Sequence, residues 1–135
     1  MTRASVAEKL GLPVVARVVA HAAHAHEPGL FTTAPVPAVR KALAKAGWTV
    51  DDVDLFEVNE AFAVVAMIAA KDLSIPPDKL NVNGGACALG HPIGASGARV
   101  IATLLGALEY RGLKRGVASL CIGGGEATAF AVELV

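Results

Sequence analysis

The chain has 135 residues, of which 54% are hydrophobic and 18% are charged, with a mean hydropathy of +0.55. This composition predicts a folded protein, and the length suits one domain with its own core. Lys and Arg number 12, as do Asp and Glu, so the broad positive field that nucleic acid or an acidic membrane requires is absent. We therefore expect no nucleic-acid partner and no membrane partner.

The cysteines and the longest apolar run indicate the compartment. Cys87 and Cys121 lie far apart without a CxxC spacing, which favours neither a disulfide framework nor a cysteine zinc site. The longest apolar run, 61–70, has ten residues, fewer than the ~18 to 20 of a membrane span. A reducing, cytoplasmic location is the expectation.

Residues 1–11 match no regular element and are expected to be a leader. Glu8, Lys9 and Pro13 interrupt the apolar character of this region, so it lacks the continuous hydrophobic core of a signal peptide. An organellar matrix is the alternative location if a targeting segment is missing upstream.

The hydrophobic pattern predicts a single domain, 1–135, in which strands alternate with helices. Gly47 ends the first helix, and Asn59 is a suitable N-cap for the second. Because 93–108 is apolar around the whole helical wheel except at Arg99, that helix should be buried between layers. The expected elements are a strand at 14–19, a helix at 35–46, a strand at 55–58, a helix at 59–73, a loop at 81–90, a helix at 93–108, and strands at 116–122 and 127–135 joined as a hairpin by glycines.

Three short segments place a reactive or polar group beside glycine or proline: 59–63 (NEAFA), 90–92 (GHP) and 121–125 (CIGGG). Glycine lets substrate approach the backbone closely, and a residue before proline is held extended, so His91 is directed rather than free. A rigid scaffold can bring all three segments to one edge of a sheet. The pattern predicts one site.

Each candidate also has a purely structural interpretation. Cys121 alone is more often a core residue than a catalyst, and Asn59 alone is more often a helix cap. His91 could be a turn histidine bonded to backbone, and Glu60 could cap the helix or orient a neighbour. The spacing of the segments favours the functional interpretation of the first three, whereas Glu60 receives no catalytic role.

Three further histidines, His21, His24 and His26, lie close together near the first strand. If the strand continues, His24 and His26 share one face. No Cys or carboxylate nearby completes a tetrahedral set, so a solvated strand end is favoured and no metal site is expected.

The sequence NVNGGACALGHPIGASG at 81–97, together with NEAFA and GVASLCIGGGEATA at 116–129, resembles the C-terminal domain of the thiolases. These are the acetyl-CoA acetyltransferases and 3-ketoacyl-CoA thiolases. The resemblance begins near Leu12 and keeps the family's motif order and spacing. Cys87 departs from it, since the family usually has an aliphatic residue there; we expect a small buried hydrophobe. The implied fold is α/β, a thiolase-like mixed β-sheet with covering helices and one buried helix.

A thiolase makes or breaks a carbon–carbon bond next to a thioester, so it must remove a proton from a methyl carbon and stabilise an enolate. By resemblance, Cys121 is the acid/base, and the site must stabilise its thiolate, because an ordinary thiol has a pKa of ~8.5. His91 activates a separate nucleophilic cysteine and binds the thioester oxygen, and Asn59 completes that oxyanion site through a water. The Gly123 N–H serves a second oxyanion site. Phe31 lies at the acyl-pocket edge, where an aromatic resembles the mitochondrial short-chain acetoacetyl-CoA group.

The resemblance also implies partners. The substrates are acyl-CoA thioesters, acetoacetyl-CoA among them, and no cofactor is required. Thiolases supply the nucleophile from an N-terminal domain in a Cys-x-Ser-Gly setting, which neither Cys87 nor Cys121 matches. This chain is therefore expected to carry half of an active site and to be inactive alone, with an N-terminal thiolase half provided in cis or in trans and a homo-oligomer as the complete enzyme.

Two other functions compete with this interpretation. The first is a non-catalytic thiolase-like domain kept for dimerisation or acyl-CoA binding. The second is a decarboxylating condensing enzyme of the ketoacyl synthase type, which would have His or Asn where Cys121 stands.

Overall fold

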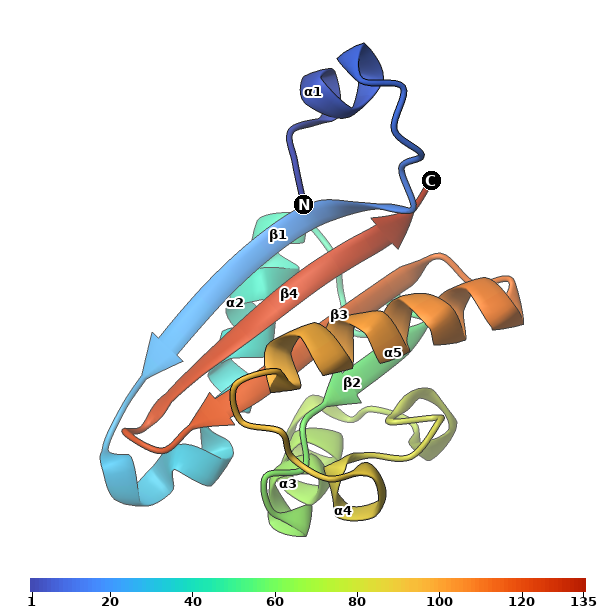
Figure 1. The fold of residues 1–135 in the computed structure, drawn as a ribbon. Coiled ribbons are helices and arrows are strands. Elements are labelled where there is room, and N and C mark those ends of the chain that lie inside the picture. The colour runs from blue at the N-terminus through green and yellow to red at the C-terminus, as the bar shows by residue number, and fades with distance from the viewer.

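The computed structural model describes residues 1–135 and is built around a four-stranded mixed sheet (Figure 1). The sheet order is β1-β4-β3-β2. Strand β4 pairs antiparallel with both β1 and β3, whereas β2 pairs parallel with β3. The strands are β1 (Ala16–Ala25), β2 (Leu55–Val58), β3 (Arg115–Ile122) and β4 (Glu126–Leu134).

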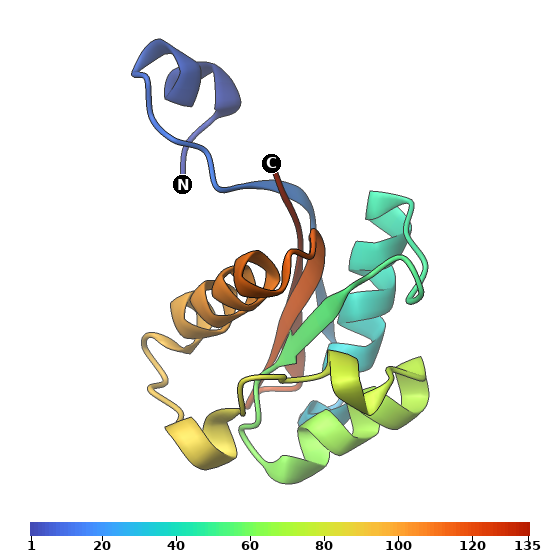
Figure 2. The same ribbon diagram turned by 90° about the vertical axis from the view of Figure 1, so that its right-hand side faces the viewer.

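Helices cover both faces of the sheet, as the edge-on view in Figure 2 shows. Helices α2 and α3 lie against one face and form the larger core with it, and α5 lies against the other face over a smaller core. The α-helices are α1 (Ala4–Lys9), α2 (Pro35–Ala46), α3 (Ala63–Leu73), α4 (Ala86–Leu89) and α5 (Ser96–Arg111), and the 3₁₀ helices are η1 (Pro28–Thr33) and η2 (Pro77–Lys79). None of these helices has the length and apolar character needed to cross a membrane.

Helix α2 has the predicted bounds because its end signals are local. Pro35 occupies the first turn, where a missing N–H costs nothing, and Gly47 takes the left-handed conformation, φ 70°, that ends a helix. The face that packs on the sheet carries Val36, Val39 and Leu43, all buried. The predicted strand at 55–58 and the hairpin of the last two strands are likewise confirmed.

Four sequence expectations need correction in the first half of the fold and the loop region. The first strand begins at Ala16 and continues to Ala25, so it is longer than the predicted 14–19. Residues 4–9, expected to be a leader without structure, form α1. The predicted loop at 81–90 contains the short helix α4. Helix α3 begins at Ala63 rather than Asn59, and its N-cap position is Phe62.

The fifth correction concerns α5, which was expected to be buried between layers. Leu104 and Leu108 on its sheet side are fully buried, whereas Ala102 and Gly106 on the opposite side are exposed. Ile93, expected inside this helix, precedes it and is 86% exposed. The wheel is apolar all round, but in this chain only the sheet packs against it.

Strand β2 determines where the site forms. It lies at the edge of the sheet, and all of its residues are buried. Because β2 and β3 are parallel, their carboxyl ends meet at the same edge of the sheet. Asn59 directly follows β2, and Cys121 is the penultimate residue of β3, so the topology brings two of the predicted site segments to one edge.

Candidate active site

The backbone joins the ends of β2 and β3. Val58 is paired with Ser119, and the Asn59 N–H donates to the Ser119 carbonyl at 2.9 Å. Cys121 lies two residues further along β3, half-buried against the larger core. The side chain of Asn59 is buried, with 1% exposure, so this amide must find its partners inside the protein.

His91 meets Asn59 at this edge. Its Nε2 lies 3.3 Å from Asn59 Nδ2, and its Nδ1 lies 2.5 Å from the hydroxyl of Ser96. Gly90 ends α4 with φ 93°, a conformation that favours glycine, and so sets the direction in which the chain reaches His91. Two of the three predicted segments are therefore in direct contact. The Asn59 side chain is hydrogen-bonded to His91 and does not have the helix-capping role that its position in the sequence had suggested.

The environment of Cys121 favours the neutral thiol. Burial raises the pKa of Cys121, and a contact with its own backbone lowers it by less. This direction is opposite to the thiolate stabilisation that the sequence led us to expect.

The glycine turn after Cys121 is held against the segment that follows β1. Gly125 has φ 98°, and a Cβ there would clash with the His26 carbonyl oxygen, so only glycine fits. The His26 N–H donates to the Gly125 carbonyl at 3.0 Å. Gly123 has open space around its Cα, which leaves its surroundings accessible from solvent.

Phe31 reaches the same region from η1. Its ring packs against that of Phe62 in an edge-to-face geometry, with 5.9 Å between the ring centroids, and Phe62 belongs to the NEAFA segment. Sequence reasoning missed Phe62, because its exposure at the start of α3 is visible only in the structure. The two rings form an aromatic edge beside the ends of β2 and β3.

Two charged residues at the site were also missed. Arg99 of α5 donates from Nη2 to Asn59 Oδ1 at 3.0 Å, and its Nη1 lies 3.4 Å from Glu57 Oε2. Glu57 is 2% exposed; burial raises its pKa to about 7, Arg99 opposes this rise and Glu60 adds to it. The sequence signals were a glutamate inside the predicted strand 55–58 and the only charged residue between 93 and 108.

Glu60 positions the loop that leads to His91. Its Oε1 accepts from Asn81 Nδ2 at 3.2 Å, and its Oε2 accepts from the Cys87 N–H at 3.0 Å. A Cβ on Gly85 would clash with this carboxylate, so the loop wraps it closely. Glu60 therefore orients neighbours, one of its two predicted alternatives. The expectation for Cys87 is wrong: it is exposed, and its backbone N–H donates to Glu60 in the loop outside the core.

The rings of the three histidines in and directly after β1 contact protein groups. His24 Nε2 lies 3.3 Å from His26 Nδ1, and Lys41 Nζ donates to His24 Nδ1 at 3.0 Å. His21 contacts the Thr128 hydroxyl at 2.8 Å. Nowhere in the chain are three or more His, Cys, Asp or Glu side chains grouped so as to hold a metal ion.

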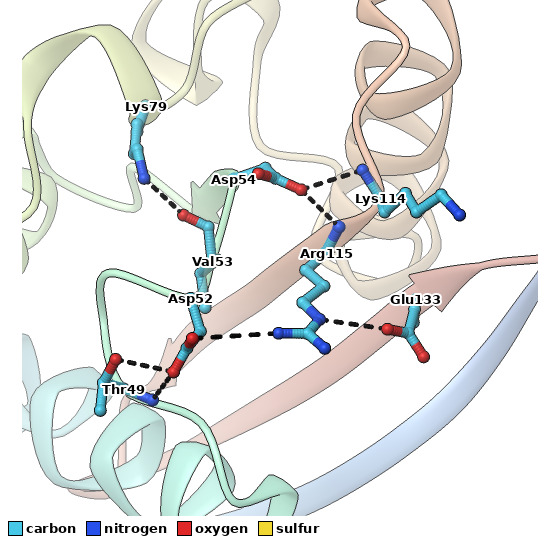
Figure 3. A network of polar contacts seen from close by, with 8 residues as sticks. All are labelled: Thr49, Asp52, Val53, Asp54, Lys79, Lys114, Arg115 and Glu133. Atoms are coloured by element: carbon cyan, nitrogen blue, oxygen red, sulfur yellow. Dashed lines mark hydrogen bonds and ion pairs between the residues drawn. The ribbon is translucent and has the colours of Figure 1, made fainter.

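A wide hollow of about 610 Å³ lies at the opposite end of the sheet and is lined by charged groups. Figure 3 shows that these groups bind one another. Asp54 accepts from the backbone N–H groups of Lys114 and Arg115 at 2.9 and 2.8 Å. The Arg115 side chain lies between Glu133, at 3.1 Å, and Asp52, at 4.0 Å. This hollow is a braced end of the sheet, and the candidate site is the other end.

Comparison with known proteins gives the family. A family model for the thiolase C-terminal domain matches residues 12–134. The acetyl-CoA acetyltransferase of Chromobacterium violaceum is 57% identical over 127 residues, which are 94% of this chain and 32% of that protein. The cytosolic acetyl-CoA acetyltransferase of Mus musculus is 52% identical over the same shares of the two chains.

A crystal structure gives the same result in three dimensions. The acetyl-CoA acetyltransferase of Bacillus anthracis superimposes with a TM-score of 0.95 at 41% identity, covering 99% of this chain and 34% of that one. The chain thus spans about a third of the length of the relatives it matches. Both the sequence motifs and the sheet with its two helical layers agree with these relatives, and the chain belongs to the thiolase family as a C-terminal domain.

Proposed function

We propose that this chain supplies one half of a thiolase active site, which transfers acyl groups between CoA thioesters and forms or cleaves the carbon–carbon bond of a 3-ketoacyl-CoA such as acetoacetyl-CoA. The observation that carries the proposal is the contact of His91 with Asn59 at the sheet edge where β3 ends in Cys121. The relatives are named acetyl-CoA acetyltransferases, which supports the substrate class.

In the proposed mechanism, Cys121 handles the proton of the methyl carbon. Cleavage of a 3-ketoacyl-CoA leaves an enolate, which must receive a proton to become acetyl-CoA. The raised pKa of Cys121 keeps that proton on the thiol until the enolate forms. Synthesis runs in the opposite direction and needs the thiolate, so the bound thioester and the rest of the site must lower this pKa.

His91 and Asn59 act on the other reacting groups. His91 Nε2 accepts the proton of a nucleophilic cysteine, and the resulting imidazolium donates a hydrogen bond to the thioester oxygen. Asn59 holds a water at that oxyanion site. The N–H of Gly123 stabilises the second oxyanion, and the ring pair of Phe31 and Phe62 forms the edge of the acyl pocket.

The remaining groups of the proposed enzyme come from elsewhere. The nucleophilic cysteine belongs to an N-terminal thiolase domain, either in the same polypeptide or in a second chain. The complete enzyme acts without a cofactor, is a homo-oligomer, and works in the cytoplasm or in an organellar matrix. The chain by itself has no turnover.

A chimera tests this function. The part of the Chromobacterium violaceum enzyme that precedes the matched region is joined to this chain at Leu12, the start of the family match. We expect thiolysis of acetoacetyl-CoA by the chimera, followed from the loss of substrate absorbance. The same chimera with His91→Ala should lose both acylation of the nucleophile and carbon–carbon chemistry.

The alternative function predicts another outcome. A folded chimera that binds acyl-CoA, and whose turnover is unchanged by His91→Ala, would contradict the catalytic proposal and leave a binding domain. A defect of His91→Ala confined to one of the two steps would show that His91 has only one of its two assigned roles.

A further inference from the structure

Arg99 reaches the site from α5, the helix that covers the sheet face opposite α2 and α3. It is the only charged residue between 93 and 108, and its guanidinium bridges Glu57 and Asn59. We infer that Arg99, held by Glu57, is a positioning residue that fixes the tautomer of His91 through the side-chain amide of Asn59. This inference deepens the proposed function and depends on it for its catalytic meaning.

Arg99 sets the orientation of the Asn59 side-chain amide. A guanidinium has only donors, so the Asn59 atom that faces Arg99 at 3.0 Å must be the oxygen. The NH₂ group is then the atom that faces His91 at 3.3 Å. The opposite orientation would place two donors against each other inside the protein, since Asn59 is buried. Arg99 therefore determines which atom Asn59 presents to His91.

The orientation of Asn59 determines which ring nitrogen of His91 carries the proton. The Asn59 NH₂ can only donate, so His91 Nε2 must accept. A neutral imidazole has one donor and one acceptor nitrogen, which places its proton on Nδ1. Nδ1 faces the hydroxyl of Ser96, which is 1% exposed at the start of α5 and accepts this proton's hydrogen bond. Both ring nitrogens thus have partners that agree on one tautomer.

Glu57 restrains the Arg99 side chain. Glu57 lies in β2, two residues before Asn59, which directly follows the strand, so the two side chains lie on the same side of the sheet. The Arg99 side chain is 18% exposed and lies with Nη1 3.4 Å from Glu57 Oε2. Arg99 Nε and Glu57 Oε1 are buried and have no hydrogen-bond partner. With so little competition from solvent, the Glu57 carboxylate holds the guanidinium against Asn59.

The chemical consequence is a base on the correct side of the ring. With the proton on Nδ1, Nε2 carries the lone pair of the ring. In this chain the lone pair accepts from the Asn59 NH₂, and in the proposed function it takes the proton of a nucleophilic thiol that displaces the amide. The other tautomer would present an N–H there and could not act as a base. The tautomer is thus set by Asn59 and Ser96 and, through Asn59, by Arg99, which does not touch His91 and lies 40 positions from Asn59.

NMR of this chain, labelled with ¹⁵N-histidine, tests the inference at about pH 8.5, where an ordinary imidazole is neutral. The spectrum of His91→Gln identifies the two ring nitrogens of His91 among those of the other histidines. We expect a donor-type shift for Nδ1 and an acceptor-type shift for Nε2. Arg99→Met should move both signals toward averaged values, because the Asn59 amide is then free to turn.

Arg40→Met is the matched control. Arg40 is an exposed arginine that donates to the Asp72 carbonyl between two helices, and its loss should leave the His91 signals unchanged. If Arg99→Met does not fold, Asn59→Asp gives the same information: a carboxylate can only accept, so His91 should reverse to the Nε2–H tautomer.

Two outcomes would overturn the inference. One is an Nε2–H tautomer in the unmodified chain, and the other is a tautomer that neither Arg99→Met nor Asn59→Asp changes. The readout requires neither substrate nor an N-terminal half. An inactive chimera would therefore contradict the proposed function and leave this inference standing, whereas an active chimera with the wrong tautomer would do the reverse.

Discussion

The two ends of the β2–β3 pair each hold an arginine beside a glutamate, but the two ends treat these charges differently. At the amino end, Arg115 lies 3.1 Å from Glu133 and over the ring of Trp48. The charged groups around it are joined to one another by hydrogen bonds and ion pairs (Figure 3). At the carboxyl end, Arg99 and Glu57 lie 3.4 Å apart, and each keeps one polar atom without a partner.

The carboxyl pKa values follow this difference. Hydrogen bonds from Thr49 lower the pKa of Asp52, and hydrogen bonds from Arg115 and then Arg17 lower the pKa of Glu133. Burial instead raises the pKa of Glu57 to about 7. Folding stabilises the charged form at the amino end and disfavours it at the carboxyl end. The amino end braces the sheet, whereas the carboxyl end keeps the poorly satisfied groups that are typical of functional sites.

The largest effect is expected at the carboxyl end, in the chimera. Cys121→Ser should lower condensation and thiolysis by ~100- to 10,000-fold, since a hydroxyl cannot exchange the proton that the thiol does. Acylation of the nucleophile should remain. Cys87→Ser is the control, because Cys87 is exposed and the substitution keeps the backbone N–H that donates to Glu60. Equal turnover of the two variants in a coupled assay would remove the assignment of Cys121.

The next effect concerns the turn that supports this end. Gly125→Ala should destabilise the chain by roughly 3 kcal/mol or more, because its φ is 98° and the added Cβ would meet the His26 backbone. Gly123→Ala, with open space around it, should change the urea midpoint little. A Gly125→Ala chain as stable as Gly123→Ala would show that the hairpin is not held against the segment after β1.

The pH dependence of stability separates the two ends directly. The pKa of Glu57 is about 7 in the folded chain against an ordinary value of 4.5, so the folded chain binds more protons than the unfolded chain between these values. Stability should therefore fall as pH rises from about 4.5 through 7, by on the order of 2 kcal/mol. Urea titrations of Glu57→Gln over the same range should show a flatter profile. An unchanged slope would place Glu57 in water rather than in the core.

The smallest effect is expected at the amino end. Asp54→Ala leaves the N–H groups of Lys114 and Arg115 without their carboxylate, which should cost about 1 kcal/mol because solvent can replace part of the contact. The neighbouring Asp51→Ala is the control, since Asp51 is exposed. Thermal unfolding of both variants measures the difference. No difference between them would mean that this end braces the sheet only weakly.

The sequence predicted the parts of the fold that depend on neighbouring residues. Helix α2 has its predicted bounds because proline starts it and a left-handed Gly47 ends it. The start of α3 was wrong for the opposite reason. Asn59 has the local features of a cap, but its side chain is used by His91 and Arg99, 32 and 40 positions away. Rules for helix caps consider only neighbouring residues, so they cannot predict hydrogen bonds to residues this far away in the sequence.

The motifs that form the site could be predicted from the sequence, whereas the residues that hold them in place, Arg99 and Glu57, could not. The three motifs could be placed at one edge because strand ends in an α/β sheet converge, and the contact of Asn59 with His91 agrees with that placement. Arg99 was visible only as a break in an apolar helix. Its direction depends on how α5 is rotated against the sheet, and the partner it finds depends on which face of β2 carries Glu57.

The register of β1 has a practical consequence for handling the protein. Ala16 lies opposite Leu134, and the Val135 N–H donates to the Val15 carbonyl at 3.3 Å, so residues 15 and 135 are neighbours at the end of the sheet away from His91 (Figure 1). A tag or surface tether at the C-terminus will leave the Asn59 edge open to solution. Joining Val135 to Val15 by a short linker would also allow circular permutation, with new ends cut in an exposed loop and a backbone that never crosses the site.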